Sequence, residues 1–290
     1  SLWCVLFIIV PMLFVVYYAF TDVNGAFTLE NLLYIARPDS GYLRSFFFSV
    51  LYALGATLIC LLIGYPIALF ISRLPERRRQ FLLMLIMVPM WVSFIIRTYT
   101  ILNIFEDNGI INAFLTKIGL NSVRFTGTPG LVLFGMVYDF LPYMVVPICN
   151  VLSGIDRKYP EAAADLGCNS RRIFTKVFLP LSVSGIVSGI TMVFVPAIST
   201  FYIASTLSGG KIALIGDKIE TAFLSNADAQ SYRTGAALSL ILMILTPVAI
   251  CCYYNAWPPL TAVLKSLLGV APMYWTVGII EVFTFVPMLG

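Results

Sequence analysis

Apolar runs of about 20 residues recur along the whole chain, separated by polar loops. A helix needs about 20 consecutive apolar residues to cross the hydrocarbon core of a bilayer. Helices are expected rather than sheets, because an open sheet leaves backbone groups unpaired in lipid and the sequence lacks the alternation of barrel strands. Six transmembrane helices are predicted, at residues 2–20, 46–72, 81–102, 130–153, 181–204 and 234–254. The sequence therefore predicts an all-α integral membrane protein.

The composition agrees with a bilayer environment. Of the 290 residues, 60% are hydrophobic and 11% are charged, whereas soluble domains carry roughly 25% charged residues. The net charge of +4 is too small and too dispersed to favour nucleic acid as a partner. The chain has no histidine, which excludes histidine-based catalysis and histidine metal ligands. The six cysteines form no C-x-x-C pair and are interpreted as small apolar packing residues.

The loops between the apolar runs differ in their density of basic residues. Residues 73–80 contain four arginines and residues 154–180 contain five Lys and Arg residues, while the other loops are sparser. Because cytoplasmic loops are enriched in Lys and Arg, we expect these two loops and the N-terminus to be cytoplasmic. The arginines at 77–79 are interpreted as an anchor to the inner leaflet. Residues 1–254 are expected to form one six-span domain.

Both ends of the chain lie inside apolar runs, which indicates a fragment. Residues 255–290 contain a Trp-Pro-Pro breaker and then an apolar run that the chain end truncates. We interpret this segment either as a tail leading into a further span, such as the first span of a fused second subunit, or as an artefact of where the fragment was cut.

The predicted cytoplasmic loop at 160–180, PEAAADLGCNSRRIFTKVFLP, is an unusually polar segment between two apolar runs. Pro160 suits the first position of a helix, and Glu161 places a carboxylate at the positive end of that helix. Three alanines follow, which are strong helix formers with almost no bulk. They predict a short helix with a flat surface that the backbone of another protein can approach closely.

The rest of this loop predicts a turn and a second helix. Gly167 provides a left-handed stop for the first helix, and Asn169 or Ser170 can cap the next one. The result is a helix-turn-helix hairpin on the cytoplasmic face. An ordinary basic loop is the alternative interpretation.

The hairpin also carries a spaced pattern: Glu-Ala-Ala, three residues, Gly, nine residues, an aliphatic residue, one residue, Leu-Pro. The pattern is formed by Glu161-Ala162-Ala163, Gly167, Val177 and Leu179-Pro180. In it the chain resembles permease subunits of ATP-binding-cassette (ABC) importers, with Val177 in place of the more usual Ile. Segments 88–100, 138–147 and 207–224 are similar to the permeases of spermidine/putrescine importers, and the resemblance covers roughly residues 1–254.

The resemblance implies a six-helix type I permease with a coupling hairpin, in a bacterial-type cytoplasmic (inner) membrane. It implies a second permease subunit beside this chain, two ABC ATPase subunits below it and an extracytoplasmic solute-binding protein that docks on the outer loops. The chain has no Walker A motif, since Gly209-Gly210-Lys211 is followed by Ile212. We therefore expect a transport subunit and not an enzyme, with no cofactor of its own and with ATP and Mg²⁺ bound by the partner ATPase.

By the same resemblance, the ATPase moves the hairpin when it closes on ATP. The residues expected to couple the two proteins are Glu161, Ala162, Ala163, Gly167, Arg171, Leu179 and Pro180. Glu161 and Arg171 are candidates for polar contacts to the ATPase. Phe174 and Leu179 are expected to anchor the hairpin to its own membrane helices.

Two charged residues, Arg97 and Asp139, lie inside the predicted spans. A charge within the bilayer is costly, so each needs a partner or a watery cavity. Polyamines are cations with methylene stems, which suit carboxylates and aromatic faces. The candidate substrate path comprises Asp139, Tyr138, Trp91, Tyr99 and Arg97. Two interpretations stay open: Asp139 contacts a passing ammonium group, or it pairs with Arg97 and locks two helices together.

Other functions compete with polyamine import. Importers with the same hairpin carry thiamine, ferric iron or oxyanions, and Arg97 would suit an anion. A secondary transporter or channel would need several intramembrane acids and inverted repeats. A membrane enzyme would need a nucleophile beside a base. We find neither pattern in this sequence.

Overall fold

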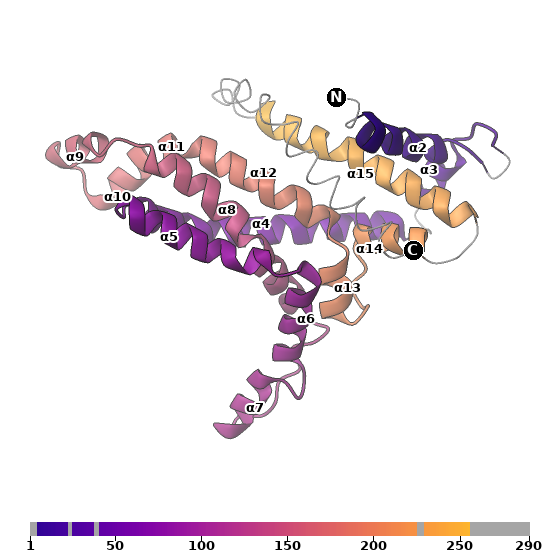
Figure 1. Ribbon diagram of the computed structural model, residues 1–290, viewed down its shortest axis with the longest axis horizontal. Coiled ribbons are helices and arrows are strands. Elements are labelled where there is room, and N and C mark those ends of the chain that lie inside the picture. Colours follow the sequence, from indigo (N-terminus) through magenta and orange to yellow (C-terminus); the bar gives the residue numbers. More distant parts are fainter. Residues whose placement is uncertain (1–4, 23–24, 38–40, 225–228, 256–290) are drawn as a thin grey trace. The chain divides into compact units, whose positions relative to one another are not determined.

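The computed structural model describes residues 5–22, 25–37, 41–224 and 229–255. Within these ranges the regular structure is helical, apart from an isolated antiparallel β-bridge between Thr21 and Phe27 (Figure 1). The α-helices are α2 (Val10–Ala19), α3 (Glu30–Ala36), α4 (Tyr42–Ser72), α5 (Glu76–Met87), α6 (Phe94–Phe105), α7 (Ile110–Lys117), α8 (Pro129–Ser153), α9 (Lys158–Asp165), α10 (Ser170–Ile173), α11 (Leu179–Leu181), α12 (Val183–Ser199), α13 (Tyr202–Ser208), α14 (Ile215–Leu224) and α15 (Ala229–Asn255). Short π- or 3₁₀-helical segments are η1 (Val5–Ile9), η3 (Val88–Trp91) and η4 (Phe174–Phe178). The predicted all-helical fold is confirmed.

In the part of the chain that the structure describes, two helices are long and apolar enough to cross a membrane, namely α4 and α8. They coincide with the predicted spans 46–72 and 130–153. Among the described residues the number rises to four if each of two bent helix pairs counts as one span. Helix α2 is a shorter apolar helix within the first predicted run, and α15 overlaps the sixth. The side chains of α15 beyond Ile244 lie outside the described part of the chain, as does the predicted tail beyond Asn255.

The third predicted span, 81–102, is broken rather than continuous. The axis bends by 88° between Glu76–Trp91 and Phe94–Lys117, so that α6 and α7 turn away from α5 (Figure 1). Pro89 lacks a backbone N–H, and the backbone then becomes extended at Val92 and Ser93, with ψ of 140° and 135°. The hydropathy of the sequence does not reveal this break, because the two extended residues do not interrupt the apolar run.

A second bend lies before the fifth predicted span. The axis turns by 66° between Ser170–Leu181 and Val183–Ser199, at Ser182. The span is therefore α12, and the segment that precedes it is the second arm of the hairpin. The predicted range 181–204 also includes the break at Thr200 and the start of α13.

The chain divides into two compact units, residues 1–49 with 213–290 and residues 50–212. The core of the second unit is the contact between α8 and α12, which lie side by side (Figure 1). Gly185 and Gly189 on α12 are four residues apart and face α8: a Cβ at Gly189 would lie 2.7 Å from the sulfur of Met144, and one at Gly185 would lie 3.1 Å from Cα of Ile148. Small residues at this spacing let two membrane helices approach closely.

In the other unit, a buried amide connects α3 with α15 and with the end of α2. Asn31 on α3 donates from Nδ2 to the carbonyl oxygens of Ala19 and Thr21, at 3.3 and 3.2 Å, and its Oδ1 accepts from Gln230 on α15 at 3.0 Å. Tyr18 on α2 packs its ring edge-to-face with that of Tyr232 on α15, at 5.4 Å between centroids. These contacts join α2, α3 and α15.

Candidate functional site

The hairpin of residues 160–180 is present, and its first helix is α9. This helix begins at Lys158, two residues before the predicted Pro160, because the carboxylate of Asp156 accepts a hydrogen bond from the Lys158 N–H at 3.0 Å. Pro160 is consequently the third helical residue, a position where the N–H has no partner within the helix.

The turn after α9 has the geometry that ends many helices at a glycine. Gly167 has a φ of 77°, in the left-handed region that favours glycine. Its N–H donates to the carbonyl of Ala164 at 2.9 Å, and the N–H of Cys168 donates to that of Ala163 at 3.0 Å. These two bonds form a Schellman motif, which closes the end of α9 rigidly. The predicted left-handed stop at Gly167 is confirmed.

The second arm begins with the predicted cap. The side chain of Asn169 accepts from the N–H of Arg172 at 2.9 Å and starts α10. The helix then widens into the π-helical turn η4 and continues as α11 to Leu181, so Leu179 and Pro180 lie within the arm and do not end it. Two short rigid arms therefore meet at the Gly167 turn.

The surface of the hairpin combines small side chains with one large apolar one. Glu161, Ala162, Gly167 and Arg171 are exposed, and Ala163 is half-buried. Nothing lies within 4 Å of the place that a Cβ on Gly167 would occupy. Leu166, at the tip of the hairpin, is 84% exposed, more than any other large apolar side chain in the described residues. Sequence reasoning missed Leu166, although an apolar residue directly before a helix-ending glycine is a signal that could have revealed it.

Aromatic contacts attach the hairpin to α4. The ring of Phe174 packs edge-to-face with that of Tyr65 at 5.5 Å, as expected for an anchor. Phe178 is buried, and the guanidinium of Arg73 lies 4.0 Å from the centre of its ring. Leu179, by contrast, is 40% exposed, so Phe178 is the side chain that fills this position. Burial lowers the pKa of Arg73, and the nearby charge of Arg157 lowers that pKa further.

A buried hydrogen bond joins α4 to the bend at the root of the hairpin. The hydroxyl groups of Tyr65 and Ser182 are 2.9 Å apart. Ser182 Oγ also lies within hydrogen-bond distance of the carbonyl oxygen of Leu179, at 3.2 Å. Because Ser182 is the residue at which the axis bends by 66°, this bond fixes the angle between the second arm and α12.

Within the second unit, Arg97 and Asp139 form an ion pair, with 2.8 Å between Nη1 and Oδ1. The Asp139 side chain is 1% exposed and that of Arg97 is 10% exposed. The pair connects α6 to α8, and it corresponds to the second of the two interpretations that the sequence left open. The N–H group of Arg97 does not point at the carboxylate oxygen as it would in a hydrogen bond. Both carboxylate oxygens of Asp139, and also Nε of Arg97, lack a hydrogen-bond partner among the described residues.

The other residues of the candidate substrate path are more exposed. Trp91, at the break before α6, is 71% exposed, Tyr99 is 50% exposed and Tyr138 is 42% exposed. The ring of Tyr99 packs edge-to-face with that of Tyr202 on α13, at 5.9 Å between centroids. The structure thus brings Arg97 and Asp139 together as an ion pair. No group of three or more His, Cys, Asp or Glu side chains in the described residues could hold a metal ion.

Comparison with known sequences gives a family match. The family described as "Binding-protein-dependent transport system inner membrane component" matches residues 61–256. The chain is 36% identical over 262 residues to the spermidine/putrescine transport system permease protein PotB of Salmonella typhimurium, covering 88% of this chain and 90% of that protein. It is 35% identical over 262 residues to PotB of Escherichia coli K12, covering 88% and 94%.

Solved structures share the fold at lower sequence identity. A bacterial ABC transporter involved in the import of the acidic polysaccharide alginate superposes with a TM-score of 0.69 and 16% identity, covering 88% of this chain and 91% of that one. The same transporter type in complex with a periplasmic protein bound to an alginate pentasaccharide gives a TM-score of 0.69 and 17% identity, covering 90% and 91%. This likeness establishes an ABC permease fold. From the match over residues 61–256 and the identity to PotB, the chain belongs to the family of inner membrane components of binding-protein-dependent transport systems, and is a multi-pass membrane protein.

Proposed function

We propose that this chain is the permease subunit of an ATP-driven polyamine importer, and that a separate ATPase moves it by docking on the hairpin of residues 160–180. The observation that carries the proposal is the exposed tip of this hairpin, where Leu166 projects beside Gly167 and the small face of α9. The identity to spermidine/putrescine permeases supports the substrate class.

The hairpin has the properties of a rigid transmission element. Its turn is closed by two backbone hydrogen bonds at Gly167 and its second arm is capped by Asn169. Leu166 would enter an apolar groove on the ATPase, while Ala162 and Gly167 allow close approach. Glu161 and Arg171 are exposed charges that would make polar contacts at the rim. A rigid-body movement of the ATPase is then passed to α12 through the bend at Ser182.

The proposed assembly follows from the separation of the membrane-spanning permease from the ATPase. Since the chain has no Walker A motif, ATP and Mg²⁺ would be bound by two ATPase subunits below it. A second permease subunit would complete the path, and an extracytoplasmic solute-binding protein would deliver the substrate. The N-terminus of residues 1–254 is proposed to lie in the cytoplasm, because the basic residues of loop 73–80 and of the hairpin favour the cytoplasmic side.

For substrate recognition we propose that Asp139 and the aromatic side chains Tyr138, Trp91 and Tyr99 face the path of the polyamine, with Arg97 as the resting partner of Asp139. An ammonium group that reaches Asp139 would compete with the guanidinium for the carboxylate. Both oxygens of that carboxylate lack an aligned hydrogen bond among the described residues, which leaves them able to accept one.

The test is ATP-driven uptake of spermidine by the complete importer in proteoliposomes. A Gly167→Gln variant adds bulk at the proposed contact and should reduce both co-purification of the ATPase and coupled uptake. Gly119→Gln is the matched control, because Gly119 also has a positive φ, of 86°, and open space around it, but lies in the loop after α7. Equal uptake by the two variants would contradict ATPase docking at the hairpin. Coupled transport of another solute without spermidine uptake would contradict only the substrate class.

A further inference from the structure

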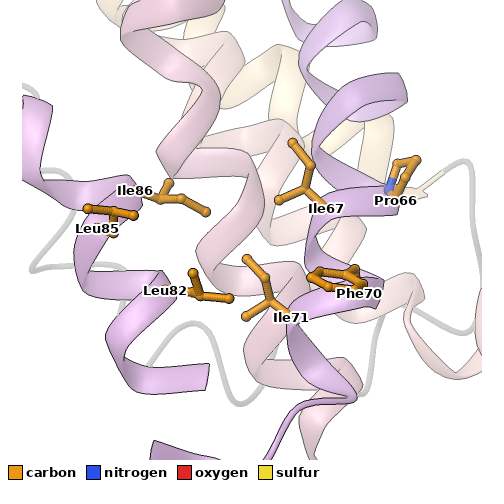
Figure 2. Close-up of a pocket in the computed structure, with 7 residues that line it drawn as sticks. All are labelled: Pro66, Ile67, Phe70, Ile71, Leu82, Leu85 and Ile86. Atoms are coloured by element: carbon orange, nitrogen blue, oxygen red, sulfur yellow. The ribbon is translucent and has the colours of Figure 1, made fainter. Parts of the chain in front are cut away.

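An apolar groove lies between α4 and α5 in the second unit, with a volume of about 410 Å³. Leu82, Leu85 and Ile86 line it from α5, and Ile67 and Ile71 are among the residues that line it from α4. Figure 2 shows Leu82 and Ile86 of α5 directed across the groove toward the side chains of α4. All of the side chains that line the groove are apolar, which suits an acyl chain.

One arginine lies on the same face of α5 as the groove. Arg78 precedes Leu82 by four residues and Leu85 by seven, a spacing that places the three on one side of a helix. Arg77 precedes Leu82 by five residues and is rotated about 140° away from it. Because helical side chains lean toward the N-terminus of their helix, the Arg78 guanidinium extends beyond the end of the groove, toward the start of α5.

Two of the neighbouring arginines are engaged elsewhere, whereas Arg78 is not. Arg79 pairs with Glu76 at 3.2 Å, and Arg73 lies over the ring of Phe178. Arg78 is exposed and makes no side-chain hydrogen bond or ion pair with any part of the chain that the structure describes. The groove therefore ends at a free guanidinium near the positively charged start of a helix, where an anion is favoured.

We propose that this groove binds one anionic phospholipid, with its phosphate on Arg78 and an acyl chain along Leu82 and Leu85. The dimensions agree: seven residues of helix span about 10 Å, which is within the half-thickness of about 15 Å of the hydrocarbon core. A zwitterionic lipid would fill the groove equally well but would gain less from Arg78. The charge at one end and the apolar walls at the other select for an amphiphile and against a free phosphate.

The experiment is photolabelling of the complete importer by phosphatidylglycerol that carries a photoreactive acyl chain, followed by peptide mapping. We expect labels on residues 67–71 and 82–86. Arg78→Gln should reduce labelling about fivefold, in line with one basic residue at a membrane surface, and Arg78→Lys should retain it. Arg77→Gln is the matched control from the same cluster and should label like the unmodified chain.

Four further outcomes decide the proposal. Leu82→Trp, which fills the groove while leaving Arg78 in place, should also reduce labelling. Equal labelling of Arg78→Gln and Arg77→Gln, or equal labelling by a phosphatidylcholine probe, would overturn it. Absence of label because the groove is covered by another protein subunit would overturn it as well. Spermidine uptake by the unmodified importer is measured in parallel, so that failure of the lipid site is distinguished from failure of the transport function.

Discussion

Arg97 on α6 and Asp139 on α8 form a buried ion pair, with their nearest atoms 2.8 Å apart. Neither carboxylate oxygen has an aligned hydrogen bond in the part of the chain that the structure describes. Removing one partner of a buried pair leaves an uncompensated charge, whereas replacing both by apolar groups of similar size is often tolerated. Single and double variants of this pair can therefore distinguish a structural role of Asp139 from a role in transport.

For this pair we predict that Asp139→Leu alone destabilises the protein by about 3–5 kcal/mol. Arg97→Met combined with Asp139→Leu should restore most of that stability, as measured by thermal unfolding in detergent. If Asp139 also contacts substrate, spermidine uptake by the double variant stays low although the protein is folded. Full uptake by a stable double variant would remove Asp139 from the substrate path and leave it as a lock between α6 and α8.

Tyr65 is predicted to transmit movement between the hairpin and α4. Tyr65→Phe removes the hydrogen bond to Ser182 and should cost about 1 kcal/mol in stability. We expect ATP hydrolysis by the complex to continue while spermidine uptake per ATP falls. Thr191→Ala is the control, since its hydroxyl bonds only to Val187 within α12. The same ratio of uptake to hydrolysis in both variants would contradict transmission through Tyr65.

The α8–α12 contact depends on glycine at two positions. Gly185→Ala should destabilise the protein by about 1–3 kcal/mol, because the added Cβ would lie 3.1 Å from the Ile148 Cα and the Pro147 carbonyl oxygen, which are backbone atoms. Gly130→Ala, on α8 with nothing within 4 Å, should be neutral or stabilising. The midpoint of thermal unfolding measures both. If the Gly185→Ala variant were as stable as the Gly130→Ala variant, this result would contradict the prediction that the α8–α12 contact depends on glycine at position 185.

Local features of the hairpin were predictable from sequence because their causes are local. The positive φ of Gly167 and the capping by Asn169 depend on residues within a single turn. The true start of α9 depends on Asp156, just outside the motif, and was misplaced by two residues. The break at Ser93 was missed because an extended residue inside an apolar run leaves no mark in hydropathy.

Tertiary contacts were less predictable. Sequence left two roles open for Asp139, since only the alignment of α6 against α8 brings Arg97 within reach. The Arg73–Phe178 contact and the Tyr65–Ser182 hydrogen bond join residues more than 100 positions apart, and no local pattern specifies such pairs. Pairing between helices is set by packing, which periodicity alone does not determine.

The most direct measurement of the central claim is photo-crosslinking from the hairpin tip in the complete importer. A benzophenone amino acid placed at Leu166 should give a light-dependent crosslink to the ATPase subunit, because this side chain is 84% exposed beside the Gly167 turn. The same group at Ile118, which is 59% exposed at the end of α7, should give none. A crosslink to the ATPase from Ile118, or its absence from Leu166, would contradict the account.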